Sequence, residues 1–452
     1  MATPLDPDRL RRILNLRSSR VRPRDDYDLP ADASTAAAGV PDGPLADLVP
    51  GEEIENAAGV CYMTTRAYAL DETRGPSSLG SLLNLPPALF HPFHPQFGLG
   101  DLHDYRHAAF LDTETTGLGN GAGVYCFMVG VGTFEPWPND RDAALHFVVR
   151  QYFMRNPVEE RALLLALDER LAEAELTVTF NGRTFDLPLL RGRYRQNRRF
   201  MPPVGEGAAS LAEDRPHLDL LHPARRLWRR RLQSCRLINL EQQILGLMRS
   251  EDDVPGHLIP ELYLQYVRNG LAGDMRRVFY HNLEDIVTMV ALGDQLSRAF
   301  GVEESPTAQT YLHELDLAAL GRAYEATNRL DLAETHYRRA LEHVRNPADR
   351  ADLFARLGNL YKRQGRWHEA ADIWQTWLSS VPDPGPTPYV ELAKACEWQL
   401  HDLAQAEMWT AWALHTLTTD PSRLAHPDVE RELRHRLDRL RRKQRDDASA
   451  AP

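Results

Sequence analysis

The chain has 452 residues, of which 43% are apolar and 26% charged, and its formal net charge is −11 at pH 7. This length exceeds what one ordinary core accommodates, so two or three domains are expected. No window approaches the roughly 18 uninterrupted apolar residues of a membrane span, and the Arg-rich N-terminus lacks the apolar stretch of a signal peptide. We therefore expect a cytoplasmic protein with no membrane partner.

Two segments precede any regular pattern. Residues 1–47 are rich in Pro, Ala, Asp and Arg without apolar periodicity, which predicts a disordered leader. Residues 48–105 hold short apolar pieces broken by Pro and Gly. We expect this N-terminal extension to wrap the domain that follows.

Residues 106–302 show the pattern of an α/β domain. The predicted strands cover 108–112, 124–134, 146–153, 176–180 and 218–221. Helical spacing over 158–175 precedes the fourth strand, and further helices follow the last one as far as residue 299. Strands first, then strands interleaved with helices, indicate a mixed sheet flanked by helices.

The first predicted strand ends in two acids, in the run Phe110-Leu-Asp112-Thr-Glu114-Thr-Thr-Gly117-Leu118. Side chains alternate between the faces of a strand, so Asp112 and Glu114 point the same way. Two carboxylates on one face repel each other, and divalent cations such as Mg²⁺ or Mn²⁺ offset that repulsion. Taken alone, the pair also fits a solvated acidic strand end, which is common.

Glycines at positions 117, 119, 121 and 123 follow the two acids. A phosphate-binding loop requires a helix after such a turn and a Lys at its end, whereas here an apolar strand follows and no such Lys occurs. A hairpin turn between the first two strands is therefore predicted.

A second motif is Val178-Thr-Phe180-Asn181-Gly182-Arg183-Thr-Phe185-Asp186-Leu-Pro188. We expect a strand to end at Phe180 and Asn181-Gly182 to form a turn. Asp186 then stands near the start of a helix, where the helix dipole favours a carboxylate. By itself this position also suits a simple N-terminal capping acid.

The next feature is a basic segment in an otherwise acidic chain. Between residues 187 and 236, twelve arginines, with Arg191 and Arg195 among them, accompany only four acidic residues. Such a segment is suited to follow a phosphate backbone, and Trp228 within it to stack on a base. The alternative is an amphipathic helix whose Trp228 belongs to the core and whose arginines are solvated.

A third motif is Tyr280-His281-Asn-Leu-Glu284-Asp285-Ile-Val. Its apolar spacing predicts a helix, and a separation of four residues puts His281 and Asp285 on one face. An imidazole one turn from a metal-binding carboxylate is well placed to take a proton from water at the metal. A lone pair with this spacing is more often an ordinary surface pair.

The C-terminal part is predicted to be helical and repetitive. Two sets of positions recur with a spacing of 37 residues, namely Leu320-Gly321, Tyr324, Ala333, Tyr337, Ala340 and then Leu357-Gly358, Tyr361, Ala370, Trp374, Trp377. A weaker third copy, 392–413, fits if one residue is inserted in its turn. The pattern resembles the tetratricopeptide repeat, whose small and aromatic positions let antiparallel helices pack closely; generic helical hairpins are the alternative. We assign the repeats to 310–420 and a capping helix and tail to 421–452.

Together the acidic motifs resemble the DEDD exonuclease superfamily, and more specifically the YprB-type ribonuclease-H-like proteins, in which tetratricopeptide-like tails also occur. The shared stretches are Leu-Asp-Thr-Glu-Thr-Thr-Gly-Leu, Asn-Gly-x-x-Phe-Asp-x-Pro and His-Asn-x-x-Asp, with Cys235-Arg-Leu-x-x-Leu-Glu241 and Asp253-Val-Pro-Gly256 between them. The resemblance extends from about residue 48 to residue 300.

The resemblance implies a metal-dependent nuclease, most simply a 3′-5′ exonuclease on single-stranded or frayed nucleic acid. It implies two Mg²⁺ or Mn²⁺ ions, one activating the attacking water and the other stabilising the leaving 3′ oxygen. The implied metal ligands are Asp112, Glu114, Asp186 and Asp285, with His281 as general base. The residues expected beside the terminal nucleotide and its backbone are Thr116, Gly117, Leu118, Asn181, Phe185, Arg191 and Arg195.

Three questions stay open at this level. In histidine-type DEDD enzymes the base precedes the last Asp by five residues, the place of Tyr280 here, whereas His281 holds the four-residue place of the tyrosine-type enzymes. We favour His281 because it shares a helix face with Asp285. The alternative functions are a structure-specific endonuclease and a nucleic-acid-binding scaffold that recruits a protein partner through its repeats. The motifs do not distinguish DNA from RNA, because contacts with a 2′-hydroxyl depend on local geometry.

Overall fold

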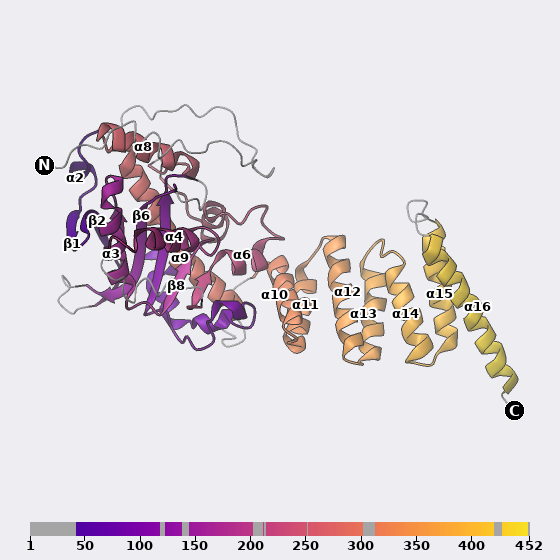
Figure 1. The fold of residues 1–452 in the computed structure, drawn as a ribbon. Coiled ribbons are helices and arrows are strands. Elements are labelled where there is room, and N and C mark those ends of the chain that lie inside the picture. Colours follow the sequence, from indigo (N-terminus) through magenta and orange to yellow (C-terminus); the bar gives the residue numbers. More distant parts are fainter. Residues whose placement is uncertain are drawn as a thin grey trace. The chain divides into compact units, whose positions relative to one another are not determined.

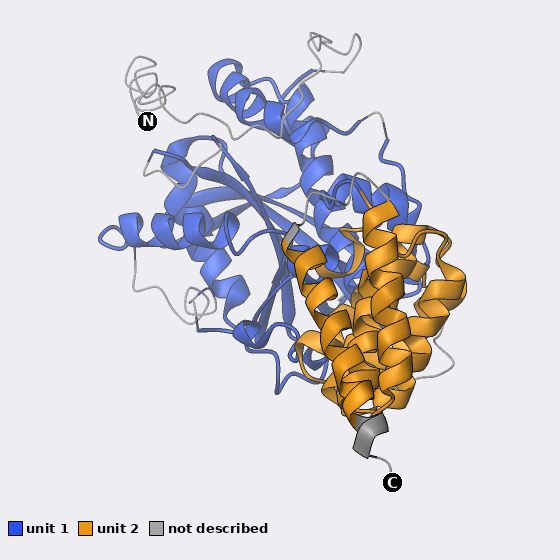
Figure 2. Cartoon of the chain, turned by 90° about the vertical axis from the view of Figure 1, so that its right-hand side faces the viewer, with its two compact units in different colours: residues 1–225, 233–309 blue, residues 226–232, 310–452 orange. Residues whose placement is uncertain are grey.

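A computed structural model describes residues 42–117, 123–137, 144–201, 211, 214–250, 252–301, 312–419 and 427–450. The chain divides into two compact units, residues 1–225 with 233–309 and residues 226–232 with 310–452 (Figure 2). Most of the predicted leader, and Leu118 with the centre of the predicted glycine turn, lie outside the described residues. Within the described ranges, no helix combines the length and apolar character that crossing a membrane requires.

The first unit is built on a seven-stranded mixed sheet flanked by helices (Figure 1). Across the sheet the strands are β1 (Glu52–Asn56), β2 (Gly59–Ala69), β7 (Leu145–Phe153), β6 (Cys126–Pro136), β5 (Ala108–Thr115), β8 (Leu176–Thr179) and β9 (His217–Asp219). Neighbours from β1 to β5 pair antiparallel, whereas β5, β8 and β9 pair in parallel. The predicted fold class, a mixed sheet with flanking helices followed by helical repeats, is confirmed.

The N-terminal extension, residues 48–105, was expected to wrap the domain that follows, but its strands β1 and β2 belong to the sheet itself. Its strand β2 pairs along β7 from Tyr62–Phe153 to Ala69–His146, so the edge of β7 is covered by hydrogen bonds. The remainder includes β3 (Thr73–Arg74), β4 (Ser77–Ser78), η1 (Leu79–Asn84), η2 (Pro87–Phe90) and η3 (Pro95–Phe97). This remainder does pack on a helix, since the rings of Phe90 and Phe300 meet with centroids 5.5 Å apart.

Six described helices lie in the first unit, namely α2 (Leu45–Leu48), α3 (Glu160–Leu171), α4 (Asp186–Asn197), α7 (Leu237–Leu240), α8 (Ile259–Asn269) and α9 (Gly273–Phe300). A further helix, α6 (Leu221–Trp228), begins in the first unit and ends in the segment 226–232 of the second. The long α9 approaches the sheet closely where β6 has glycines. A Cβ atom at Gly130 would collide with Ile286 and Asn282 of α9, and one at Gly132 would collide with Ile286 and Phe147. Glycine at these positions therefore brings the third acidic motif, which lies on α9, against the strand next to β5.

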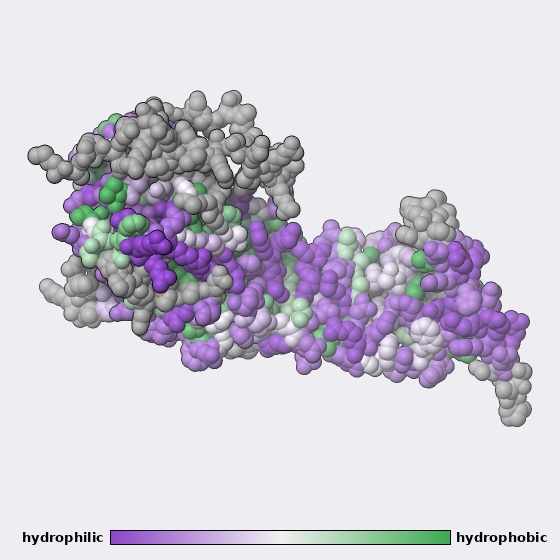
Figure 3. Space-filling model, in the orientation of Figure 1, coloured by the Kyte–Doolittle hydropathy of each residue, from purple (hydrophilic) through white to green (hydrophobic). Residues whose placement is uncertain are grey.

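The second unit consists of antiparallel helices, α10 (Glu314–Ala326), α11 (Leu330–His343), α12 (Pro347–Arg363), α13 (Trp367–Ser380), α14 (Thr387–Trp398), α15 (Leu403–Thr419) and α16 (Pro427–Ala450). A Cβ atom at Gly321 would collide with the Tyr337 ring, and one at the equivalent Gly358 would collide with Trp374. The small and aromatic positions thus let α10 pack closely on α11 and α12 on α13, as predicted. The visible face of this unit is largely hydrophilic (Figure 3).

The turns of the repeats also follow the sequence pattern. Three residues separate α10 from α11 and α12 from α13, whereas four separate α14 from α15. The extra residue expected in the third copy is therefore present. The backbone has positive φ at Asn328, Gly365 and His401, one in each of these turns.

We expect the buried His217 on β9 to make the stability of the first unit sensitive to acid. Its Nε2 lies 2.8 Å from the Thr179 hydroxyl. Burial, with a smaller contribution from the nearby Arg183 and Arg191 charges, lowers the pKa of His217 to about 3. The folded state therefore favours neutral imidazole, and the stability this contributes is full above pH ~6.5 and is lost as the pH falls toward 3.

We expect the wild type to lose up to about 1.4 kcal/mol per pH unit more than His217→Gln below pH 6.5. Urea unfolding at pH 7.5, 6 and 5 measures this difference. His103→Gln, which replaces an exposed histidine of the same unit, is the control and should follow the wild type. Parallel pH curves for His217→Gln and wild type would contradict the expectation.

Candidate active site

The two acids of the first motif lie at the end of β5, just before a register shift that follows Glu114. The Asn282 side chain of α9 donates from Nδ2 to Asp112 Oδ2 at 2.8 Å. Asn282 is itself held, because its Oδ1 accepts from Gln151 Nε2 at 2.9 Å. Contacts from α9 and β7 therefore set the orientation of Asp112.

The second motif forms the turn that the Asn-Gly pair predicts. Asn181 has the left-handed backbone conformation, with φ of 68°. The fully buried Asp219 of β9 accepts the backbone N–H of Asn181 at 2.7 Å and of Arg183 at 3.1 Å, which fixes the turn. Asp186 follows as the first residue of α4, and the Thr113 hydroxyl of β5 donates to its carboxylate. The parallel pairing of β5 and β8 brings these two motifs to the same edge of the sheet.

Acids of the three motifs lie close enough for their charges to affect one another. Burial raises the pKa of Asp112 well above its usual range, and the charges of Asp285 and Asp186 raise it further. Burial also raises the pKa of Glu114 well above its usual range, and repulsion from the other three carboxylates raises it further. Burial raises the pKa of Asp186 to about 6, although the hydrogen bond from Thr113 acts in the opposite direction and lowers it. The four acids therefore form one cluster, hereafter the acidic cluster, whose charges repel.

On α9, His281 lies between two carboxylates. Its Nδ1 is 2.7 Å from Asp253 Oδ1, and its Nε2 is 3.7 Å from Asp285 Oδ2, one helical turn away. Burial, the largest influence, lowers the pKa of His281, but the two carboxylates outweigh it and the net shift is upward. His281 and Asp285 also line one cavity of about 240 Å³ together with Asp253 and Arg249.

The neighbouring Tyr280 lies elsewhere. Its hydroxyl accepts the backbone N–H of Ser250 at 3.3 Å, and its side chain lines a different hollow, with Thr64 and Arg66 of β2. The sequence left Tyr280 and His281 as alternatives for the general base. Of these two, it is His281 that lines a cavity together with Asp285.

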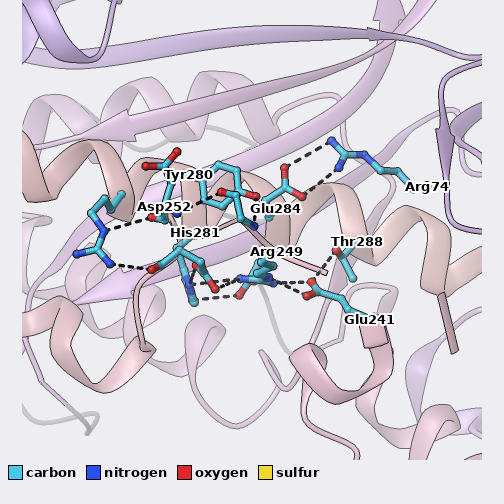
Figure 4. A network of polar contacts seen from close by, with 12 residues as sticks. Arg74, Glu241, Arg249, Asp252, Tyr280, His281, Glu284 and Thr288 are labelled. Atoms are coloured by element: carbon cyan, nitrogen blue, oxygen red, sulfur yellow. Dashed lines mark hydrogen bonds and ion pairs between the residues drawn. The ribbon is translucent and has the colours of Figure 1, made fainter. Parts of the chain in front are cut away.

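An arginine sits against the acidic cluster. Arg249 donates to Asp285 and, on its other side, from Nε to Glu241 Oε2 at 2.7 Å. Figure 4 shows the Arg249 side chain between His281 and the pair formed by Glu241 and Thr288. One carboxylate of the cluster is thus already engaged by a cation.

The donor chemistry of the acidic cluster suits a hard divalent cation. Mg²⁺ and Mn²⁺ take carboxylate oxygen ligands, and their charge offsets the repulsion among buried carboxylates. Among the residues that the structure describes, no three His, Cys, Asp or Glu side chains are arranged as a formed metal site. The ligand types therefore fit such an ion, while the arrangement that the side chains adopt is one in which Arg249 binds Asp285.

The residues predicted beside the substrate lie in different surroundings. Thr116 closes the β5–β6 hairpin, since its N–H donates to Tyr125 O and its hydroxyl accepts from Tyr125 N. Gly117 is partly exposed next to it. Phe185, directly before Asp186, has 51% of its surface exposed, unusual for a large apolar side chain.

The arginine segment does not form one continuous basic surface. Arg193 is 4% exposed and pairs with the buried Glu160, and Arg191 donates to the Leu211 carbonyl, whereas Arg195 is exposed on α4. Trp228 is 3% exposed, so it belongs to the core and the stacking interpretation of this residue is wrong. In a helix as short as α6, the spacing of apolar residues did not predict which face would be buried.

Further along the segment, arginines of the second unit are engaged in ion pairs. Arg230 pairs with Asp349 and Asp352 at 2.9 Å each, and Arg231 with Asp316 at 3.1 Å. These charges neutralise acids of the repeat helices rather than standing as a free basic patch.

Sequence reasoning missed several side chains that hold the site. Asn282, Glu241 and Asp253 lie within the quoted stretches His-Asn-x-x-Asp, Cys-Arg-Leu-x-x-Leu-Glu and Asp-Val-Pro-Gly, so the shared motifs carried a signal that was not used. Asp219 and Arg249 lie outside the motifs assigned a role. Only the fold relates them to the acidic cluster.

A mixed sheet with acids at the end of one strand, at the start of the helix after the neighbouring strand and on a crossing helix defines the ribonuclease-H-like class of protein. Comparison with known families agrees, because the RNase_H superfamily matches residues 109–297 and the tetratricopeptide repeat matches residues 317–351 and 353–386. The chain is also 31% identical over 338 residues to the uncharacterized protein YprB of Bacillus subtilis (strain 168), a match that covers 74% of each chain. The chain therefore belongs to the YprB family of ribonuclease-H-like proteins.

Membership of this superfamily indicates a nuclease, hence a hydrolase whose substrate is nucleic acid, and divalent metal ions are typical of the class. The tetratricopeptide repeats indicate a protein-interaction module.

Proposed function

We propose that residues 106–302 form a metal-dependent 3′-5′ exonuclease that hydrolyses single-stranded or frayed nucleic acid. In this proposal Asp112, Glu114, Asp186 and Asp285 hold two Mg²⁺ or Mn²⁺ ions. The observation that carries it is the acidic cluster, in which the charges of Asp186 and Asp285 raise the pKa of Asp112 and of Glu114. Up to 173 residues separate these side chains in the sequence. Carboxylates that repel one another at a buried or partly buried site weaken the fold, so their convergence calls for a function that uses them.

The bound ions supply positive charge, which activates water and stabilises the charge developing in phosphodiester hydrolysis. The protein contributes orientation. Asn282 fixes Asp112, and Thr113 fixes Asp186, so two of the four proposed ligands are held by hydrogen bonds from neighbouring elements.

His281 is the proposed general base. Its Nδ1 is within hydrogen-bonding distance of Asp253, an arrangement in which a neutral ring donates from Nδ1 and keeps Nε2 as the acceptor. Nε2 lies on the side of Asp285, within the same cavity. Asp253 thus supports His281 as the proton acceptor.

Near the acids, exposed side chains are available to nucleic acid. We propose that Phe185 stacks on the terminal base and that Asn181, Thr116, Gly117 and Leu118 border the same nucleotide. The exposed Arg195 is proposed to contact a backbone phosphate, with Arg191 near it.

The repeats, which we place at 310–420, are proposed to bind a protein partner. Met408 and Trp412 of α15 are exposed to 42% and 47% and stand one helical turn apart. Large apolar side chains on one exposed helix face are typical of interaction surfaces.

Digestion of matched single-stranded DNA and RNA oligonucleotides, labelled at the 5′ end, tests the proposed activity. With Mn²⁺ or Mg²⁺ we expect products that shorten stepwise from the 3′ end, and no products with a chelator present. The ratio of the two rates identifies the preferred nucleic acid.

The same experiment separates the alternatives. Single internal cuts would indicate a structure-specific endonuclease that uses the same acids. No cleavage of either oligonucleotide, together with no Mn²⁺ binding in calorimetry, would indicate a scaffold and refute the proposed activity.

A further inference from the structure

Arg249 is a buried cation in contact with the acidic cluster. Its side chain is 7% exposed and lies in the segment between η5 (Glu241–Leu245) and η6 (Gly256–Leu258). It pairs with Asp285 and Glu241, and its Nη1 is 3.5 Å from Asp253 Oδ2. Three carboxylates from separate segments therefore surround one guanidinium.

The two sides of this guanidinium have different anchors. Glu241 is 2% exposed, accepts from Arg249 Nε at 2.7 Å and also accepts the Thr288 hydroxyl at 2.7 Å (Figure 4). Glu241 is not one of the four proposed ligands, so this contact is independent of the cluster. Arg249 Nη2 donates both to Glu241 and to Asp285, which is one of the four, while Nη1 faces Asp253 and His281.

The charge of Arg249 reaches beyond Asp285. It lowers the pKa of both Asp112 and Glu114, opposing the larger effects of burial and of the neighbouring acids. Arginine does not lose its proton in proteins, so this positive charge is permanent. The Arg249 charge therefore offsets part of the repulsion among the carboxylates, as a bound divalent ion would do.

The arrangement of the acids is consistent with this role. Oδ1 of Asp285 is occupied by Arg249, and no three acids within the described ranges have the arrangement of a formed metal site. A divalent ion that takes Asp285 as a ligand competes with a cation already bound to the same carboxylate.

We propose that Arg249 is the resident cation of the acidic cluster in the absence of metal and nucleic acid, and that a divalent ion gains Asp285 only in exchange for it. This inference rests on the proposed assignment of the four acids as metal ligands. It assigns Arg249 a function that the superfamily motifs do not include. After the exchange, Glu241 and Thr288 still hold the arginine close to the site.

Titration calorimetry of the full chain with Mn²⁺, without nucleic acid, tests the exchange. Arg249→Gln removes the competing charge and is expected to bind Mn²⁺ at least about tenfold more tightly than the wild type, since a unit charge a few ångströms from a divalent ion costs at least this much affinity. Arg249→Lys keeps the charge and is expected to bind Mn²⁺ much as the wild type does.

Arg74→Gln is the matched control. Arg74 pairs with Glu284, the residue next to Asp285 on α9, at 3.0 Å, and its charge does not contact the acidic cluster. Arg74 belongs to β3, so removing it takes away one positive charge that is paired with α9 and should leave Mn²⁺ affinity within about twofold of the wild type. The comparison separates a local exchange from a general change in net charge.

Arg249→Gln leaves Glu241 buried without its partner, which is expected to lower stability. The double variant Arg249→Gln with Glu241→Gln removes both charges, so it keeps the test valid if the single variant does not fold. Thermal melting in chelator identifies the variants that are folded.

Two results overturn the inference in different ways. In the first, the wild type binds Mn²⁺, while the folded Arg249→Gln and double variants bind it equally well or more weakly. Arg249 would then be a positioning residue for Asp285, and only the proposed exchange would be overturned. No Mn²⁺ binding by any variant overturns the ligand assignment as well.

Discussion

Asp112→Asn is expected to reduce the proposed nuclease activity by at least about 10³-fold, more than the 10–100-fold typical of a lost supporting contact. Asparagine has the shape of aspartate but carries no charge, so it is a weak ligand for a hard divalent ion. The side chain still offers Asn282 an oxygen acceptor. Initial rates on a labelled oligonucleotide in Mn²⁺ measure the loss.

The same variant separates lost chemistry from lost folding. Because burial raises the pKa of Asp112, the charged side chain is unfavourable in the folded chain without metal. Asp112→Asn should therefore melt no lower than the wild type in chelator, while Mn²⁺ should raise its melting temperature less than that of the wild type.

Asp274→Asn is the control for this prediction. Asp274 stands in the first turn of α9 with 48% of its side chain exposed, so its substitution should change neither activity nor Mn²⁺ binding. Equal activities of Asp112→Asn and Asp274→Asn would show that the acidic cluster is not the source of hydrolysis.

Arg193→Met is expected to lower the free energy of unfolding of the first unit by about 3–5 kcal/mol, the range for breaking a buried ion pair from one side. Arg193 and Glu160 are 4% and 6% exposed, and Nη2 donates to Glu160 Oε2 at 2.7 Å. Asn197 also donates to that carboxylate, at 2.9 Å. Without the guanidinium, Glu160 keeps a buried charge that one amide does not neutralise. Urea unfolding measures the loss.

Arg195→Met provides the matched comparison on the same helix. Arg195 is exposed, so the substitution should change stability by less than about 0.5 kcal/mol. Adding Glu160→Gln to Arg193→Met should recover much of the loss, because it removes the unpaired charge. If Arg193→Met is as stable as Arg195→Met, the pair between α3 and α4 does not have the assigned role.

Features that depend on local periodicity were available in the sequence. Alternation in β5 placed Asp112 and Glu114 together, Asn181-Gly182 predicted the left-handed turn, and four-residue spacing placed His281 beside Asp285. The 37-residue recurrence gave the repeats and the longer third turn. These predictions held because strand and helix geometry relates residues a few positions apart in a fixed way.

The class of fold was therefore predictable from the residue pattern, and the same pattern singled out the four acids now proposed as metal ligands. The burial of Arg193, the core position of Trp228 and the contacts of Asn282 and Arg249 with acids of the cluster became visible only in the folded chain. Asn282 reaches Asp112 across 170 positions, and Arg249 reaches Asp285 across 36. No local pattern reports such contacts, because they depend on how strands and helices far apart in the chain pack against each other.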